Sequence, residues 1–282
     1  MIWIVVAVAV LAAAATLLGA YGEPTAVSGA WAYAGTIVLA VGASAVGSMV
    51  GLGGGLIMVP VLIFTGVPPP VAAAASLAAT LTNAASSTAT YARQNRIDYR
   101  EGTKMGAVAA PGSVLGAVWS SGAEPGIFGV LLAMALIAAA VYIFVRSKMS
   151  RHSVLHGGTI IALSASASFF AGMVSAFFGI GGGIVFVPLL VVVLGMSMMR
   201  AAPTSMFALI LTSTAGVAAH SLLGHTDAVL ALLLAAGGVL GGLTGARLSL
   251  IMGERYLRVM VAVLMSGVAA KLVWDALSAN SQ

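Results

Sequence analysis

Apolar residues run in long, nearly uninterrupted stretches along this chain, separated by short polar, glycine or proline segments. A helix needs about 20 apolar residues to cross roughly 30 Å of hydrocarbon, so each stretch of that length predicts a membrane-spanning helix. Such stretches lie at 1–21, 71–91, 103–121, 126–145, 201–223, 228–250 and 256–274. They lack the alternation of barrel strands, so the pattern predicts an all-α, polytopic membrane bundle.

Two further apolar stretches, at 31–64 and 159–194, are too long for one helix, and a glycine cluster interrupts each of them. The first cluster reads Gly51-Leu-Gly-Gly-Gly-Leu-Ile-Met-Val-Pro60. The second, 128 positions later, reads Gly179-Ile-Gly-Gly-Gly-Ile-Val-Phe-Val-Pro188. Glycine lets the backbone turn, so we expect each stretch to be a broken helical hairpin, either re-entrant or crossing twice. The proline after each cluster is expected to kink the second, short helix.

The residues after the two clusters also recur, at an offset of 129. A single register over several helices is not expected by chance, and it predicts an internal duplication. The matching pairs are Ser76 with Ser205, Asn83 with Thr212, Asp98 with Asp227, Gly112 with Gly241 and Gly116 with Gly245.

The duplication predicts the organisation of the whole chain. We expect an N-terminal helix and linker at 1–30, a first repeat at 31–146, a basic cytoplasmic linker at 147–158, a second repeat at 159–276 and a tail at 277–282. Each repeat is a broken hairpin followed by three spans. The segment at 1–21 could instead be a cleaved signal peptide, but its apolar run is longer than the usual 7 to 15 or so residues and it lacks a basic start.

Positive charges predict the orientation, because cytoplasmic loops carry an excess of Lys and Arg. With a cytoplasmic N-terminus and an even number of crossings in each broken stretch, 11 of the 12 cations fall inside and only Lys271 falls outside. A single crossing per broken stretch would place only 8 inside. The two repeats are therefore predicted to be inverted. The cations placed inside are Arg93, Arg96, Arg100, Lys104, Arg146, Lys148, Arg151, Arg200, Arg247, Arg255 and Arg258.

Composition excludes several classes of function. Charged residues make up 7% of the 282 residues, against about a quarter in soluble domains, which excludes a soluble enzyme and a disordered chain. The formal charge of +5 comes without a basic run, so no nucleic acid is expected as a partner. With no Cys and four scattered His, we expect no metal and no cofactor. No nucleophile, base and orienting group share a recognisable spacing, so we predict no catalytic residues and no enzyme.

The glycine clusters form the candidate substrate site. A glycine break at the same place in two inverted repeats is typical of a transporter's central site, because unwound backbone in a membrane must be covered by protein or line a cavity. The helix after each break would offer free N–H groups and a positive dipole end to an anion near the bilayer midplane. Close helix packing by small residues is the alternative. The candidates are Gly53, Gly54, Gly55, Gly181, Gly182 and Gly183.

A polar stripe follows each break. Ser76, Thr80, Asn83 and Ser87 share one helical face, and the second repeat keeps Ser205 and Thr212 at the first and third of these positions. We predict that Ser76, Asn83, Ser205 and Thr212 also bind substrate, with interhelical hydrogen bonding as the alternative.

Other polar residues have more local interpretations. His220, which takes the place of Tyr91 in the second repeat, is a candidate for proton coupling or a hydrogen-bonded group at the interface. Asp98 and Asp227 are predicted to cap the helices that follow them. The paired glycines at 112 and 116 and at 241 and 245 predict close helix packing.

The doubled glycine motif resembles that of the TauE/SafE family of sulfite and organosulfonate permeases, also called the toluene-sulfonate uptake permease family. The resemblance rests on both glycine clusters with their prolines and on Ala75-Ser76 and Thr204-Ser205, and it extends from about Trp31 to Trp274. It implies a bacterial inner-membrane carrier, an exporter of sulfite, sulfonates or similar small anions. Coupling to protons or ions stays open. A non-transporting biogenesis or anchoring subunit is the alternative function.

Overall fold

The computed structural model describes residues 30–122, 134 and 157–251, and the described segments form helices joined by short turns. The predicted helices at 1–21, 126–145 and 256–274 and the tail at 277–282 lie outside the described residues. The elements are α2 (Ala30–Val50), α3 (Gly55–Phe64), α4 (Pro69–Arg93), α5 (Tyr99–Ser120), α7 (Gly157–Phe178), α8 (Gly183–Pro188), the π-helix η2 (Leu189–Val193), α9 (Met198–Leu222) and α10 (Ala228–Leu248).

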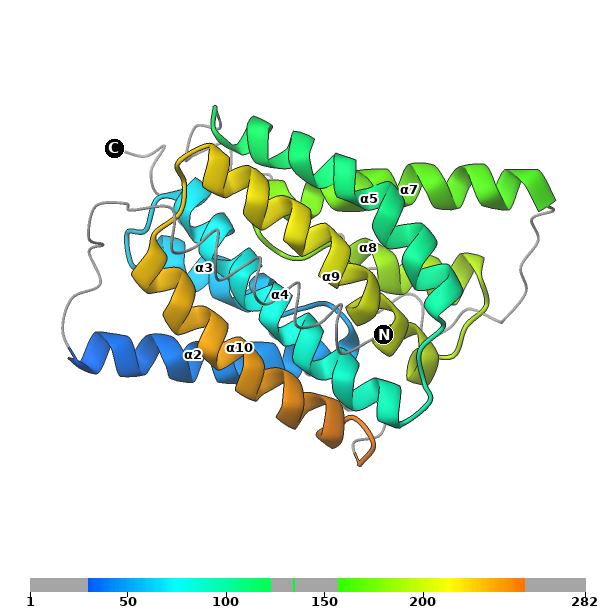
Figure 1. Ribbon diagram of the computed structural model, residues 1–282, viewed down its shortest axis with the longest axis horizontal. Helices are drawn as coiled ribbons and strands as arrows, with labels where there is room; N and C mark the ends of the chain where they lie inside the picture. Colours follow the sequence, from blue (N-terminus) through cyan, green and yellow to red (C-terminus); the bar gives the residue numbers. More distant parts are fainter. Residues whose placement is uncertain (1–29, 123–133, 135–156, 252–282) are drawn as a thin grey trace.

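The apolar lengths of the helices suit a membrane. Among the described residues, three segments are long and apolar enough to span it, at Tyr33–Val50, Met198–Leu222 and Ala228–Leu248. Helices α4 and α9 cross the middle of the bundle side by side (Figure 1). Most of α4 is buried although it is rich in Ala, Ser and Thr, because its small side chains admit neighbouring helices closely.

The helices of the two halves are interleaved. Helix α5 of the first half packs on α7 and α9, and α10 of the second half packs on α2 and α4 (Figure 1). Glycine allows this close approach: a Cβ at Gly112 or Gly116 would meet the carbonyl oxygen of Phe169 or Met173 on α7. Glycines 241 and 245 meet the α2 backbone in the same way. The predicted packing role of both glycine pairs is confirmed.

Aspartate side chains cap the N-termini of two helices, α5 and α10. Asp98 Oδ1 accepts a hydrogen bond from Glu101 N–H at 3.2 Å, and Asp227 Oδ1 accepts one from Leu230 N–H at 2.9 Å. These bonds satisfy N–H groups that have no partner inside the helix. Both predicted caps are confirmed.

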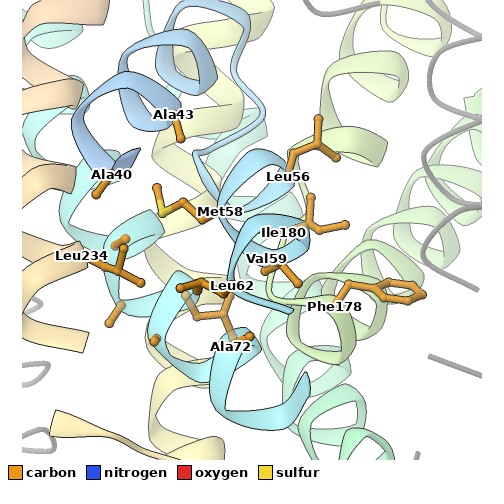
Figure 2. Packing of buried hydrophobic residues seen from close by; sticks show 14 of the residues in the cluster. Ala40, Ala43, Leu56, Met58, Val59, Leu62, Ala72, Phe178, Ile180 and Leu234 are labelled. Atoms are coloured by element: carbon orange, nitrogen blue, oxygen red, sulfur yellow. The ribbon is translucent and has the colours of Figure 1, made fainter. Parts of the chain in front are cut away.

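The short helix α3 lies inside the bundle. Its ten residues rise about 15 Å, half of what a membrane crossing requires. Figure 2 shows Met58 of α3 pointing toward Ala40 and Ala43 of α2, while Ile180 comes from the second half. Pro60 lies within α3, which continues to Phe64.

The proline of the second half has a different effect on its helix. Pro188 ends α8 after six residues, and the next turn, Leu189–Val193, is π-helical. The two prolines therefore do not produce the same local structure, although the sequence predicts one kinked helix after each break.

One end of the bundle carries the Lys and Arg residues of the described part of the chain. Arg96, in the turn after α4, donates to the carbonyl oxygen of Met199 at 2.8 Å and to Ser249 Oγ at 3.1 Å. The end of α4, the start of α9 and the end of α10 thus meet there. The other members of this cationic end are Arg93, Arg100, Lys104, Arg200 and Arg247. The connections at the opposite end, 65–68, 121–122 and 223–227, contain no Lys or Arg.

Candidate substrate site at the paired glycine turns

Glycine is required at several positions of both turns. In the first turn φ is +81° at Gly51 and +74° at Gly53, and in the second it is +73° at Gly179, +91° at Gly181 and +67° at Gly182. Side chains with a Cβ rarely adopt such angles. The sequence therefore needs glycine here for the turn itself, apart from any ligand.

The two turns face each other through their backbones. A Cβ at Gly55 would meet the carbonyl oxygen of Gly179 and lie 2.9 Å from Ile180 Cα. In the matching contact, a Cβ at Gly183 would meet the carbonyl oxygen of Gly51 and lie 2.6 Å from Leu52 Cα. The structure thus brings the glycines of both clusters together.

One serine from the opposite half of the chain bonds to each turn. Ser76 Oγ donates to the carbonyl oxygen of Gly179 at 2.7 Å, and Ser205 Oγ donates to the carbonyl oxygen of Gly51 at 2.7 Å. Both side chains are buried. A hydroxyl has one proton to donate, so in this arrangement these two offer a ligand only acceptor lone pairs.

Several backbone donors of the first turn are left free, whereas in the second turn the Gly183 N–H donates to the carbonyl oxygen of Gly181 at 2.8 Å. In the first turn, N–H groups of Gly51 and Leu52 bond back to α2, and the next bonds start at Ile57 and Met58. Within the described residues, no oxygen accepts a bond from the N–H groups of Gly53, Gly54 and Gly55. These residues are buried, and buried N–H groups without a partner are rare in proteins. At the start of α3 they form a set of donors suited to an anion.

The deeper members of the polar stripe, Asn83 and Thr212, donate to backbone carbonyl oxygens of helices. Asn83 Nδ2 donates to the carbonyl oxygen of Ser44 at 3.2 Å, while Thr212 Oγ1 donates to Leu209 in its own helix at 3.2 Å. Thr80 contacts both turns, since its Cγ2 is 2.8 Å from the Cβ position of Gly53 and 2.6 Å from that of Gly181. Helical periodicity grouped these residues on one face, and contacts with the turns are shown for Ser76 and Thr80 of that face.

His220 is held by two ring contacts. Its Nε2 lies 2.9 Å from the carbonyl oxygen of Ala176, and its Nδ1 lies 3.0 Å from His225 Nδ1. A carbonyl only accepts, so Nε2 carries the hydrogen. In the first half, the Tyr91 hydroxyl makes the matching bond to the carbonyl oxygen of Ser48 at 2.9 Å. The shared bond favours a role in joining helices, and proton coupling by His220 stays a prediction.

Two serines beside the turns, Ser44 and Ser175, were not predicted from the sequence. Ser44 Oγ lies 2.9 Å from the Cβ position of Gly54, and Ser175 Cβ lies 3.3 Å from that of Gly182. Both side chains are fully buried, and neither hydroxyl has a hydrogen-bond partner. They precede the breaks and do not match in the repeat register, since Ser44 corresponds to Gly172 and Ser175 to Gly47. Comparison of the two repeats therefore could not reveal them.

The comparisons with known proteins agree with this architecture. The sequence profile of the sulfite exporter TauE/SafE family matches residues 36–272. The chain belongs to this family. As a member it is a multi-pass membrane protein of a transporter family. Within the described residues, no three His, Asp or Glu residues lie together in a group that could hold a metal ion.

Three proteins that are similar to this chain carry transporter names. A probable membrane transporter protein of Bacillus subtilis, YunE, is 27% identical over 85% of this chain and 96% of its own length. A probable membrane transporter protein of Haemophilus influenzae is 26% identical over 79% of this chain and 88% of its own. A third, ORF9 of a Sinorhizobium species, is 25% identical over 79% and 85%. No solved structure matches.

Proposed function

We propose that the protein is a secondary carrier that exports sulfite, an organosulfonate or a similar small anion, bound between the two glycine turns. The observation that carries this proposal is the set of buried, unpartnered N–H groups at Gly53, Gly54 and Gly55 at the start of α3. They combine free donors with the positive end of a helix dipole. The matching glycines of the second turn, Gly181, Gly182 and Gly183, would complete the site from the opposite side, with the N–H groups of Gly181 and Gly182 as donors, because that of Gly183 donates to the Gly181 carbonyl oxygen.

Neutral donors suit a transported anion. Amide N–H groups and hydroxyls bind an oxyanion strongly once water is excluded, yet they add no buried full charge that would hold it permanently. The Lys and Arg residues of the described segments belong to the cationic end. The sulfur-containing substrate is suggested by the name of the family. No cofactor and no catalytic residue are part of this proposal.

We further propose that the halves 31–146 and 159–276 are inverted repeats. The interleaved packing of α5 and α10 supports this, as does Figure 1, where α2 and α7 begin at opposite ends of the long axis. Helix α3 has ten residues, and α8 with η2 spans 183–193. Each rises about half of the hydrocarbon thickness, so each broken stretch is proposed to be re-entrant.

The proposed orientation places the cationic end in the cytoplasm of a bacterial cell, with the protein in the inner membrane and the N-terminus inside. The native chain has no Cys, so single introduced cysteines report accessibility without background. Gly66→Cys should label from outside and Gln94→Cys from inside. Labelling of both from the same side would contradict the topology.

Flux measurements test the function. Purified full-length protein in liposomes should move sulfite or a sulfonate such as methanesulfonate down its gradient. Absence of flux for sulfite and for a panel of sulfonates would favour the alternative, a non-transporting biogenesis or anchoring subunit. Imposed proton and sodium gradients in the same assay test the proposed coupling, with a His220→Gln variant as the probe for proton coupling.

A further inference from the structure

Three buried hydroxyls without partners border the paired turns. They belong to Ser44 on α2, Thr80 on α4 and Ser175 on α7, and all three side chains have 0% exposed surface. None of their oxygens has a hydrogen-bond partner. Such a group costs free energy when it stays unpaired in the folded protein, so three beside one feature require an explanation.

The Ser44 and Thr80 hydroxyls lie next to glycines of the turns, and Ser175 contacts the Cβ position of Gly182 through its Cβ. Ser44 Oγ is 2.9 Å from the Cβ position of Gly54, and Thr80 Oγ1 is 3.5 Å from that of Gly181. The Thr80 methyl group contacts the Cβ positions of both Gly53 and Gly181. Ser44 therefore flanks one turn, and Thr80 lies between the two turns.

Hydroxyls without a partner also occur away from the turns, at Thr88 on α4, Ser164 and Ser168 on α7 and Ser213 on α9. Their position beside the glycines therefore distinguishes Ser44, Thr80 and Ser175, while other buried serines are paired. Ser76 and Ser205 donate to the opposite turn. Ser120, equally buried on α5, donates to Ala117 in its own helix at 2.7 Å. A buried serine on a helix commonly bonds a carbonyl of the preceding turn. Ser44 and Ser175 do not, although each is helical.

We propose that Ser44, Thr80 and Ser175 donate hydrogen bonds to a bound SO3 group, the pyramidal trioxide shared by sulfite and sulfonates. Three single donors beside the free N–H groups of Gly53 and Gly54 match the several acceptor oxygens of such a group. The inference rests on the proposed function and adds that substrate recognition comes from helices before as well as after the breaks. It also makes the site unequal, because Leu209 takes the place of Thr80 in the second half.

The test compares stability with anion binding in the same variants. Ser44→Ala, Thr80→Val and Ser175→Ala remove one hydroxyl each, and Thr80→Val keeps the packed methyl group. Thermal unfolding of the purified full-length protein is followed with sodium sulfite, sodium methanesulfonate and sodium chloride at equal ionic strength. Ser120→Ala is the control, because it removes an equally buried hydroxyl that has a partner away from the turns.

Wild-type protein and the Ser120→Ala variant should be stabilised by sulfite or methanesulfonate more than by chloride. Without these anions, the three hydroxyl variants should be as stable as wild type or more so, because each loses an unpaired buried group. Their Kd for the stabilising anion should rise tenfold or more, about 1.4 kcal/mol for each factor of ten. The anion that stabilises distinguishes free sulfite from a sulfonate.

Two results would overturn the inference. If wild type is stabilised but Ser44→Ala and Thr80→Val keep its Kd, these hydroxyls do not contact the anion and the proposed function is unaffected. If the variants are instead destabilised without anion and bind it normally, the hydroxyls serve the fold. A wild-type protein that neither responds to these anions nor moves them would overturn the proposed function itself.

Discussion

The two glycine turns have nearly the same sequence but different backbones. Gly54 has φ −87° in the right-handed helical region, whereas Gly182, at the matching position, has φ +67° in the left-handed region. A left-handed backbone therefore requires glycine at position 182 but not at position 54. Space around Gly54 is nevertheless tight, since a Cβ would lie 3.1 Å from Ser44 Cα and would meet the movable end of Met58.

The side chains around the two turns also differ. Ser44 and Thr80 lie beside the first turn, and the corresponding positions of the second half hold Gly172 and Leu209. After the turn, α3 continues as an α-helix, while the second half changes to a π-helix after Pro188. A motif in two copies therefore fixes a turn in each half without fixing its dihedral angles, because the neighbours that restrict each turn differ.

The largest expected loss of stability comes from substitutions that disrupt the backbone contact between the two turns. Gly55→Ala and Gly183→Ala each place a Cβ against a carbonyl oxygen of the opposite turn, and neither backbone can yield without moving the other. Each should cost about 3 kcal/mol or more in unfolding free energy. The yield of monodisperse protein in detergent and its unfolding midpoint measure this. Gly35→Ala, with open space at its Cβ position, is the control, and equal stability of all three proteins would contradict the packed turns.

The next prediction separates the two turns. Gly182→Ala should cost about 1–2 kcal/mol, because its left-handed backbone disfavours a Cβ, and Gly182→Asn should cost less, since Asn tolerates that region better. At Gly54, where φ is negative, Asn should be no better than Ala. Unfolding midpoints of the four variants give the comparison. The same order of Ala and Asn at both positions would show that the turns are alike.

Removal of the reciprocal serine bonds should affect both halves about equally. Ser76→Ala leaves the Gly179 carbonyl without its donor, and Ser205→Ala does the same to Gly51. An unsatisfied buried carbonyl costs about 1–3 kcal/mol. Chemical or thermal unfolding of each variant, beside Ser120→Ala, measures it. A loss confined to one of the two variants would mean that the matching bonds do not contribute alike.

The smallest expected effect concerns the turn between α9 and α10, where His225 contacts His220. Burial lowers the pKa of His225 below its usual 6.5, so below that pH the unfolded chain binds more protons than the folded protein. Stability should therefore fall as the pH decreases below about 6.5. His225→Gln should lessen this fall, as measured by unfolding midpoints at pH 7.5 and 5.5. An unchanged pH dependence would assign it to other groups.

Local features of the fold could be predicted from the sequence. The caps at Asp98 and Asp227, the helix breaks at the glycines and the close packing at Gly112 and Gly241 depend on a few residues and their chemistry. The candidate site was predicted in part. Its glycines meet as expected, and substrate binding by Asn83 and Thr212 stays a prediction. The serines at 44 and 175 were missed because they have no counterpart in the other repeat.

The sequence by itself thus determined that this chain belongs in a membrane, where the helices of its described part lie and where two stretches break, because hydropathy and backbone freedom are properties of neighbouring residues. Only the tertiary structure decided that Ser76 bonds to Gly179, that Gly54 and Gly182 differ in φ, and that Ser44 is buried without a partner. Each of these depends on atoms brought from another helix. Contacts over more than a hundred residues of chain follow from how the helices pack, and no local pattern encodes them.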